Sequence, residues 1–204
     1  MDMRVDGPWD VSEIPAGDAV ERLDLGSILV TPTSGIDVQA QADQATGTVS
    51  QLTFNRPDSM VQVQPYAAPR SGGLWDEVRG QISSSINSSG GLVEVVDGPF
   101  GPELKAQVVP SDGSAGLQPA RFCGIEGPRW FLRAVFLGKA ARPGEAADAL
   151  EAMVRSLVVV RGSEAMPVGA PIPIRLPRQP EEIAAQAPSL PSPFERGPEI
   201  TETR

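Results

Sequence analysis

The side chains with the clearest chemical potential lie on two segments, 117–125 and 129–137, which are predicted to form a β-hairpin. Alternation divides the second segment into two sets: Trp130, Leu132, Ala134 and Phe136 on one face, and Arg129, Phe131, Arg133 and Val135 on the other. We expect the first set to face the core. A three-residue turn at 126–128 would then place Arg121 opposite Arg133 and Cys123 opposite Phe131.

This register makes the arginine-bearing face the candidate binding surface, with the members Arg121, Cys123, Arg129, Phe131 and Arg133. Two like charges directly opposite each other destabilise a sheet by up to about 1 kcal/mol unless an anion or an acid lies between them. Arginine planes and aromatic rings stack on bases, so an anion or single-stranded nucleic acid could bind here. Pairing with some of the chain's own 26 acidic residues is the favoured alternative. Cys123 is expected to be a small, partly buried side chain, because only the arginines could activate its thiol.

A second, weaker anion site is the loop Arg70, Ser71, Gly72 and Gly73, which directly precedes a predicted helix. Free backbone N–H groups at a helix start can cradle a phosphate. The loop lacks the lysine and the spacing of a P-loop, and Asp76 and Glu77 in the next turn would repel an anion. A flexible helix entry is the favoured interpretation.

The composition excludes the commonest catalytic and metal-binding groups. The chain has no histidine and a single cysteine, so it has no Ser-His-Asp or Cys-His system, no imidazole metal site and no thiolate zinc cluster. We assign no catalytic residue, cofactor or metal ligand. A carboxylate-dependent enzyme is the least favoured alternative, because Glu145, Asp148 and Glu151 are predicted to form an ordinary solvated helix face.

Charge and hydropathy indicate a cytoplasmic protein that does not enter membranes. Seventeen basic residues face 26 acidic ones, a net charge of -9 that would repel a phosphate backbone. The first ten residues are acidic and lack the apolar stretch of an export signal, and no apolar run approaches the length of a spanning helix. A lone cysteine suits a reducing compartment.

The elements that would position these residues follow from periodicity and turn signals. Strands are predicted at 23–30, 36–42, 47–54, 60–66, 92–96, 103–109, 117–125 and 129–137, and helices at 74–89 and 143–157. Short connections require antiparallel pairing. We therefore predict an α+β fold with an antiparallel sheet of about seven or eight strands, both helices on one face, and the other face open to solvent or a partner.

Three parts are expected along the chain: an acidic N-terminal arm at 1–21, a single α+β domain at 22–161 and a proline-rich flexible tail at 162–204. Nine prolines fall in the last 38 residues, and few aromatics accompany them. Residues 167–204 are therefore predicted not to order themselves. Such a segment is long enough to strap the domain or to engage another protein.

Several segments resemble a known family. They are Gly7-Pro8-Trp9-Asp10-Val11, Leu23-Asp24-Leu25-Gly26-Ser27, Ala67 to Asp76, Asp97-Gly98-Pro99-Phe100, Gln118 to Phe122 and Gly127 to Arg133. This pattern, from about residue 7 to about 175, is similar to an actinobacterial family of conserved hypothetical proteins, DUF3710, a domain of unknown function. The resemblance implies a cytosolic protein and no functional residue. More remotely, the order of elements resembles the PsbP-like α/β sandwich, which is used mostly for binding.

These observations favour a non-catalytic binding or adaptor protein. Its unknown protein partner would dock on the open sheet face, on the proline-rich tail, or on both. The alternative is an anion or single-stranded nucleic-acid binder that uses Arg121, Arg129 and Arg133.

Overall fold

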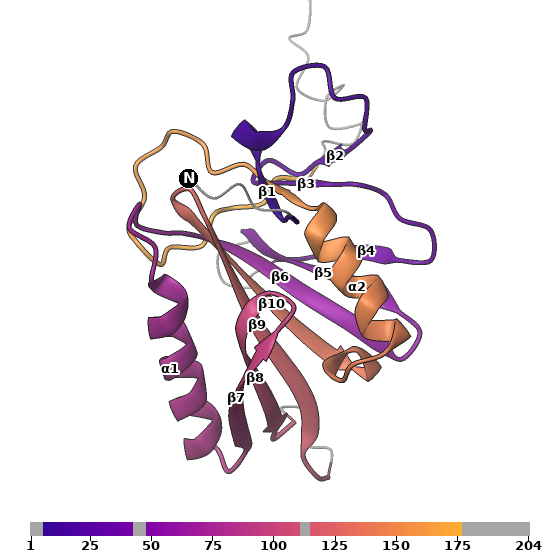
Figure 1. The fold of residues 1–204 in the computed structure, drawn as a ribbon, viewed down its shortest axis with the longest axis vertical. Coiled ribbons are helices and arrows are strands. Elements are labelled where there is room, and N and C mark those ends of the chain that lie inside the picture. The colour runs from indigo at the N-terminus through magenta and orange to yellow at the C-terminus, as the bar shows by residue number, and fades with distance from the viewer. Residues whose placement is uncertain (1–5, 43–47, 111–114, 177–204) are drawn as a thin grey trace, which may run out of the picture.

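A seven-stranded antiparallel sheet forms the centre of the protein (Figure 1). The computed structural model describes residues 6–42, 48–110 and 115–176. The sheet has the order β4-β5-β6-β10-β9-β8-β7. Its strands are β4 (Asp37–Ala42), β5 (Val49–Arg56), β6 (Ser59–Ala67), β7 (Leu92–Gly98), β8 (Gly101–Val108), β9 (Gln118–Gly127) and β10 (Trp130–Gly138). The predicted antiparallel α+β fold is confirmed.

The two helices, α1 (Leu74–Ser88) and α2 (Glu145–Ser156), pack on opposite faces of this sheet (Figure 1). The prediction that both cover one face is wrong. Strand β10 is apolar on both sides: Phe131 packs with α1, whereas Leu132 packs with α2. The reverse side of the sheet is therefore not left entirely free.

The larger core lies between the sheet and α2 and includes these buried side chains: Leu52, Phe54, Val61, Val63, Leu132, Phe136, Leu150, Met153 and Val154. The smaller core lies under α1, where Leu74 and Trp75 pack on Phe131. Gly124 is essential to this contact, since a Cβ at that position would collide with the Trp75 indole. The indole N–H donates to the Pro102 carbonyl at 2.6 Å, which ties α1 to β8.

A second, four-stranded sheet has the order β1-β11-β3-β2. Its strands are β1 (Trp9–Asp10), β2 (Leu23–Asp24), β3 (Ile28–Val30) and β11 (Val158–Val159). The predicted strand 23–30 is thus two strands, because the chain turns at Gly26 with φ 79°. Strands β1 and β11 pair in parallel, which brings Trp9 beside Val158.

The N-terminal arm is part of this fold. The Asp10 carboxylate is buried and accepts a hydrogen bond from the Trp130 indole at 2.7 Å. The Glu13 carboxylate in turn accepts from the Asp10 N–H at 2.6 Å, as in a capping box. These contacts join the predicted arm to the centre of the sheet.

The beginning of the predicted tail is also ordered, so the prediction that residues 167–176 cannot order is wrong. This segment runs beside the end of β6 that β5 does not reach, with the Ile172 N–H donating to the Pro65 carbonyl at 2.9 Å. Ile172 and Ile174 are buried in the larger core. Two isoleucines with a proline between them resemble a disordered sequence in composition. Their backbone hydrogen bonds nevertheless go to the neighbouring strands, from Ile172 to Pro65 of β6 and from Ile174 to Val49 of β5 at 2.7 Å. The rest of the predicted tail, 177–204, lies outside the described residues.

Neither helix has the length and hydropathy needed to cross a membrane, as far as the described residues go.

We expect the Ile172→Ala variant to lower the free energy of unfolding by about 2 to 5 kcal/mol, because it leaves a cavity in the larger core. Urea denaturation of the full chain measures this. Val168→Ala, an exposed change in the same segment, is the control and should stay within about 0.5 kcal/mol of the parent. An equal loss of unfolding free energy in both variants would contradict the docking of residues 167–176 on the sheet.

Candidate functional site

The turn between β9 and β10 contains two residues, Pro128 and Arg129, instead of the three predicted. Gly127 pairs with Trp130 across the turn, and Arg129 has φ 64°. Since proline holds φ near about -65°, the signs are those of a type II turn. The Arg129 carbonyl accepts from the Ala68 N–H at 2.9 Å and from Arg161 Nε at 3.2 Å, which stabilises the unusual φ.

This turn shifts the hairpin register by three positions, so that Ile125 lies opposite Leu132 and not opposite Arg129. An odd shift moves one strand's side chains to the other face. Arg121 therefore lies opposite Phe136, and Cys123 opposite Ala134, both on the core side. The predicted cluster of Arg121, Arg129 and Arg133 around Phe131 does not form.

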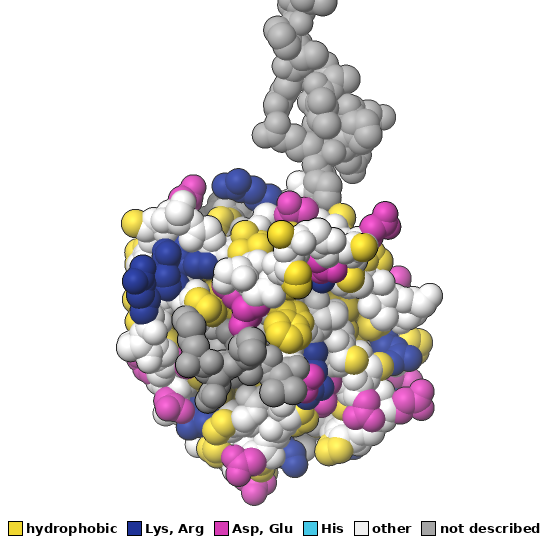
Figure 2. All heavy atoms as spheres, turned by 45° about the horizontal axis from the view of Figure 1, so that its top comes forward, with side chains coloured by type: hydrophobic (Ala, Val, Ile, Leu, Met, Phe, Trp, Pro, Cys, Tyr) yellow, Lys and Arg dark blue, Asp and Glu magenta, His cyan; other side chains and the backbone are white. Residues whose placement is uncertain are grey.

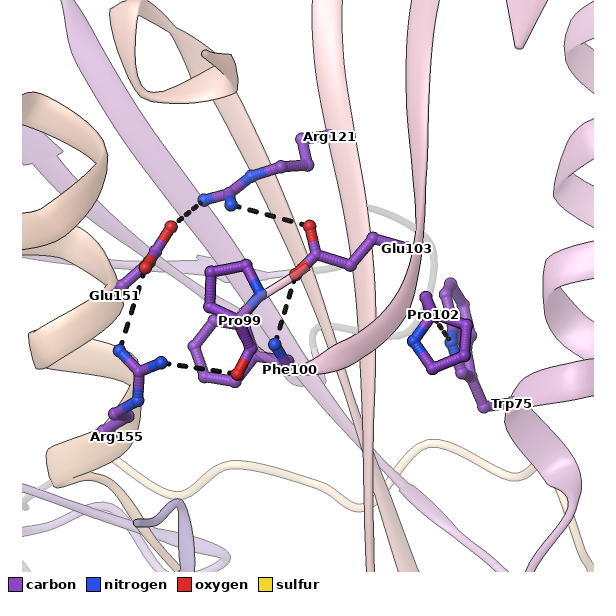
Figure 3. Close-up of polar contacts among 8 residues, drawn as sticks. All are labelled: Trp75, Pro99, Phe100, Pro102, Glu103, Arg121, Glu151 and Arg155. Atoms are coloured by element: carbon purple, nitrogen blue, oxygen red, sulfur yellow. Dashed lines mark hydrogen bonds and ion pairs between the residues drawn. The ribbon is translucent and has the colours of Figure 1, made fainter. Parts of the chain in front are cut away.

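Arg121 instead lies at the centre of a buried ion-pair network (Figure 3). Its guanidinium is 2.6 Å from the Glu151 carboxylate of α2 and 3.5 Å from the Glu103 carboxylate of β8. Arg121, Glu103 and Glu151 are 3%, 1% and 7% exposed, respectively. The guanidinium also stacks 4.2 Å from the Phe136 ring centre. The network joins α2 to the sheet, which is the internal pairing favoured by the sequence.

The prediction that Glu151 belongs to a solvated helix face is wrong for this residue. Its second carboxylate oxygen lies 3.7 Å from Arg155 one helical turn later, and Arg155 also donates to the Pro99 carbonyl at 3.3 Å (Figure 3). The helix presents Glu151 to Arg121, and this carboxylate together with Glu103 compensates the buried positive charge.

Cys123 is completely buried beside the same network. Burial raises the pKa of its thiol well above the usual value, and the negative charge of Glu103 acts in the same direction. The thiol is therefore protonated and enclosed, which is the environment of a structural cysteine.

In the loop Arg70–Gly73, the backbone N–H groups of Gly72 and Gly73 are occupied by the chain itself. The two oxygens of the Glu126 carboxylate accept from the N–H groups of Gly73 and Trp75, each at 2.9 Å. A carboxylate at the positive end of α1 satisfies donors that an outside anion would need. Glu126 was assigned to a turn from the sequence, and nothing in its spacing from α1 signals this contact.

Phe131 and Arg133, the members of the candidate surface that face α1, line a groove between α1 and the sheet. The groove has a volume of about 330 Å³, and its walls are Tyr66, Leu74, Glu77, Val78, Gln81, Phe131, Arg133, Val168 and Gly169. Aromatic and aliphatic walls with a few convergent polar groups are typical of binding sites.

Polar contacts hold the open side of this groove in place. The Gln64 carbonyl oxygen accepts from the Tyr66 hydroxyl at 2.6 Å and from the Arg133 guanidinium at 2.8 Å. Burial raises the pKa of Tyr66, with Arg133 opposing, so the phenol remains a proton donor. Arg133 is half-buried, and its guanidinium lies 5.6 Å from the Tyr66 ring centre.

Beyond the groove, the sheet face on the α1 side is mainly polar across β4, β5 and β6. The strand registers place five glutamines there, which we call the glutamine face: Gln39, Gln41, Gln51, Gln62 and Gln64. The Gln51 amide donates to the Gln41 carbonyl oxygen at 2.8 Å. This surface was not predicted, although glutamines at a spacing of two in 39–41 and 62–64 were a usable signal for it.

Within residues 6–42, 48–110 and 115–176, no group of three or more Cys, Asp and Glu side chains is placed to hold a metal ion. The arrangement offers amides, one guanidinium and aromatic rings, which form hydrogen bonds and contacts.

A comparison with protein-family models matches residues 7–183 to a family described as a protein of unknown function, DUF3710. No curated protein matches the sequence. The actinobacterial origin and the PsbP-like likeness stay predictions.

The buried network makes stability depend on pH through Glu103. Burial raises the pKa of Glu103 above its usual 4.5, with Arg121 opposing. The folded state thus holds this proton more tightly than the unfolded chain, and the group's contribution to stability falls as the pH rises above 4.5. We expect Glu103→Gln to flatten this dependence in urea denaturation at a series of pH values. Glu94→Gln, an exposed change on β7, is the control, and equal slopes in both variants would refute the assignment.

We expect Glu126→Gln to lower the free energy of unfolding by about 1 to 2 kcal/mol, because the amide lacks the charge and the second acceptor that cap α1. Thermal or urea denaturation followed by helical circular dichroism measures the change. Glu94→Gln again serves as the matched control. A neutral Glu126→Gln variant would show that the cap contributes nothing.

Proposed function

We propose that this chain, which belongs to the DUF3710 family of proteins of unknown function, is a non-catalytic binding protein. Its protein partner would dock on the glutamine face and the adjoining groove. The observation that carries this proposal is the uneven cover of the sheet. Helix α1 packs against β7, β8 and β9, and no helix of the described residues packs over the glutamine face on β4, β5 and β6.

The chemistry of this half suits a polar protein surface. Each glutamine carries both donors and an acceptor, so the face can match a partner's hydrogen bonds without burying a charge. Tyr66 and Phe131 beside it supply aromatic area of the kind enriched in interfaces. Arg133 adds one charged donor at the border between the face and the groove.

The folded structure supports a nucleic-acid partner less well than the sequence alone did. The register leaves Arg133 as the one arginine of the predicted cluster on this face, because Arg121 is paired in the core and Arg129 lies in the turn. On the described part of the surface drawn in Figure 2, basic side chains stand in separate groups among acidic ones. With a net charge of -9, the phosphate contacts that support non-specific binding are weak.

The proline-rich residues 177–204 are the second element of the proposal, as a segment that a partner could engage. They follow directly on residues 167–176, which lie against β6 close to the groove through Val168 and Gly169.

The proposal is tested by capture of a partner from the cytosol of the native host, followed by titration of the purified partner. We expect Gln62→Arg to weaken the affinity at least tenfold, since a long charged side chain would be buried at the centre of the contact. Gln107→Arg, the same change at a half-buried glutamine on the opposite face of β8, is the control and should bind like the parent.

Two results would overturn the proposal. One is a captured partner that binds the Gln62→Arg variant as tightly as the parent. The other is the absence of any protein that binds the parent chain in purified form.

A further inference from the structure

A second hollow lies at the small sheet, away from the glutamine face. It has a volume of about 280 Å³ and lies between the turn at Gly26 and Ser27, residues 160–164 after β11, and the docked segment at 172–175. We propose that this hollow is a binding site for a small organic anion, whose carboxylate or phosphate group is held by Arg161 and Ser27.

The Arg161 side chain is a buried charge without an acidic partner. It is 9% exposed, and its Nε and one terminal nitrogen donate to the backbone carbonyls of Arg129 and Glu164 at 3.2 and 3.1 Å. No carboxylate of the described residues lies within 4.0 Å of it. A buried charge is costly unless it is paired. The other terminal nitrogen is free to donate to a ligand in the hollow.

A second unsatisfied group belongs to a residue that lines the same hollow. The Ser27 hydroxyl is enclosed in a residue that is 3% exposed, and it forms no hydrogen bond to any described residue. Buried hydroxyls in proteins nearly always have a partner. In our proposal the Ser27 side chain rotates so that its hydroxyl donates to the oxyanion that Arg161 holds.

The surrounding charges favour an anion. Burial lowers the pKa of Arg161, and the positive charge of Arg129 lowers it further, with Glu164 opposing. Arg175 supplies another guanidinium at the edge of the hollow, where its side chain packs over Gly26. Glu164 contacts Arg161 through its carbonyl and forms no ion pair with it, so its carboxylate offsets only part of the positive charge of the site.

The rest of the lining determines the class of ligand. Four of the lining side chains are apolar: Val160, Met166, Ile172 and Pro173. The free terminal nitrogen of the guanidinium can donate to an oxygen of a carboxylate or of a phosphate alike. The hollow therefore suits a compact molecule with one oxyanion group and a small apolar body.

Calorimetric titration of the full chain at constant ionic strength tests this with three probes: inorganic phosphate, acetate and hexanoate. We expect saturable binding of at least one probe. Tighter binding of hexanoate than of acetate would identify a carboxylate with an apolar body, and binding of phosphate alone would identify a phosphate ligand.

Three variants locate the site. Arg161→Gln should weaken binding at least tenfold, and Ser27→Ala should weaken it severalfold without loss of stability, since its hydroxyl has no hydrogen bond to lose within the described protein. Arg142→Gln, which removes the same charge from an exposed position before α2, is the control and should bind like the parent.

The Ser27→Ala arm remains informative even if Arg161→Gln fails to fold. The proposal is wrong if none of the three probes binds saturably to the parent chain. It is also wrong if the probes bind Ser27→Ala and Arg142→Gln with equal affinity.

Discussion

The register of the β9–β10 hairpin is the constraint on which the rest of the structure depends. Pro128 and Arg129 close the hairpin in two residues, and every pair along the two strands follows from that turn. The register sends Arg121 and Cys123 to the α2 side, and it leaves Phe131 and Arg133 on the α1 side. The turn is stabilised from outside the hairpin, because Ala68 and Arg161 both donate to the Arg129 carbonyl.

The two sides of the sheet are closed by different physical means. On one side, an apolar core and a buried ion-pair network hold α2 to the sheet. In this network Arg121 connects Glu151 of α2 with Glu103 of β8 (Figure 3). On the other side the Trp75 indole packs on the strands and donates to Pro102, while Glu126 caps the start of α1. Because α1 covers only part of that side, the glutamine face lies outside the area that the helix covers. The proposed binding surface is therefore the part of the sheet where the side chains on the α1 side are mainly amides and not apolar groups.

Segments from the early and the late parts of the described chain meet at the small sheet and form the second proposed site. Gly26 and Ser27 come from the turn before β3, Arg161 follows β11, and Arg175 belongs to the docked C-terminal segment. Each of these groups is unremarkable along the sequence. Their chemistry arises from proximity, since a guanidinium and a hydroxyl become unsatisfied only when they are buried together.

The sequence by itself determined the local structure. Periodicity located both helices and the strands of the large sheet to within a few residues, because side-chain alternation and turn residues act over short distances. It also excluded histidine chemistry and predicted that the arginines would find acidic partners within the chain, as Arg121 does.

Only the tertiary structure decided which faces these elements present. The hairpin turns through two residues, Pro128 and Arg129, and not through the three predicted at 126–128, and Arg129 adopts a left-handed conformation. This one difference places Arg121 and Cys123 on the other face of the sheet. Helix placement, the burial of Glu151 and the docking of Ile172 depend on contacts between residues far apart in sequence. Such contacts carry no local signature, because their energy comes from surfaces that exist only after the chain has folded.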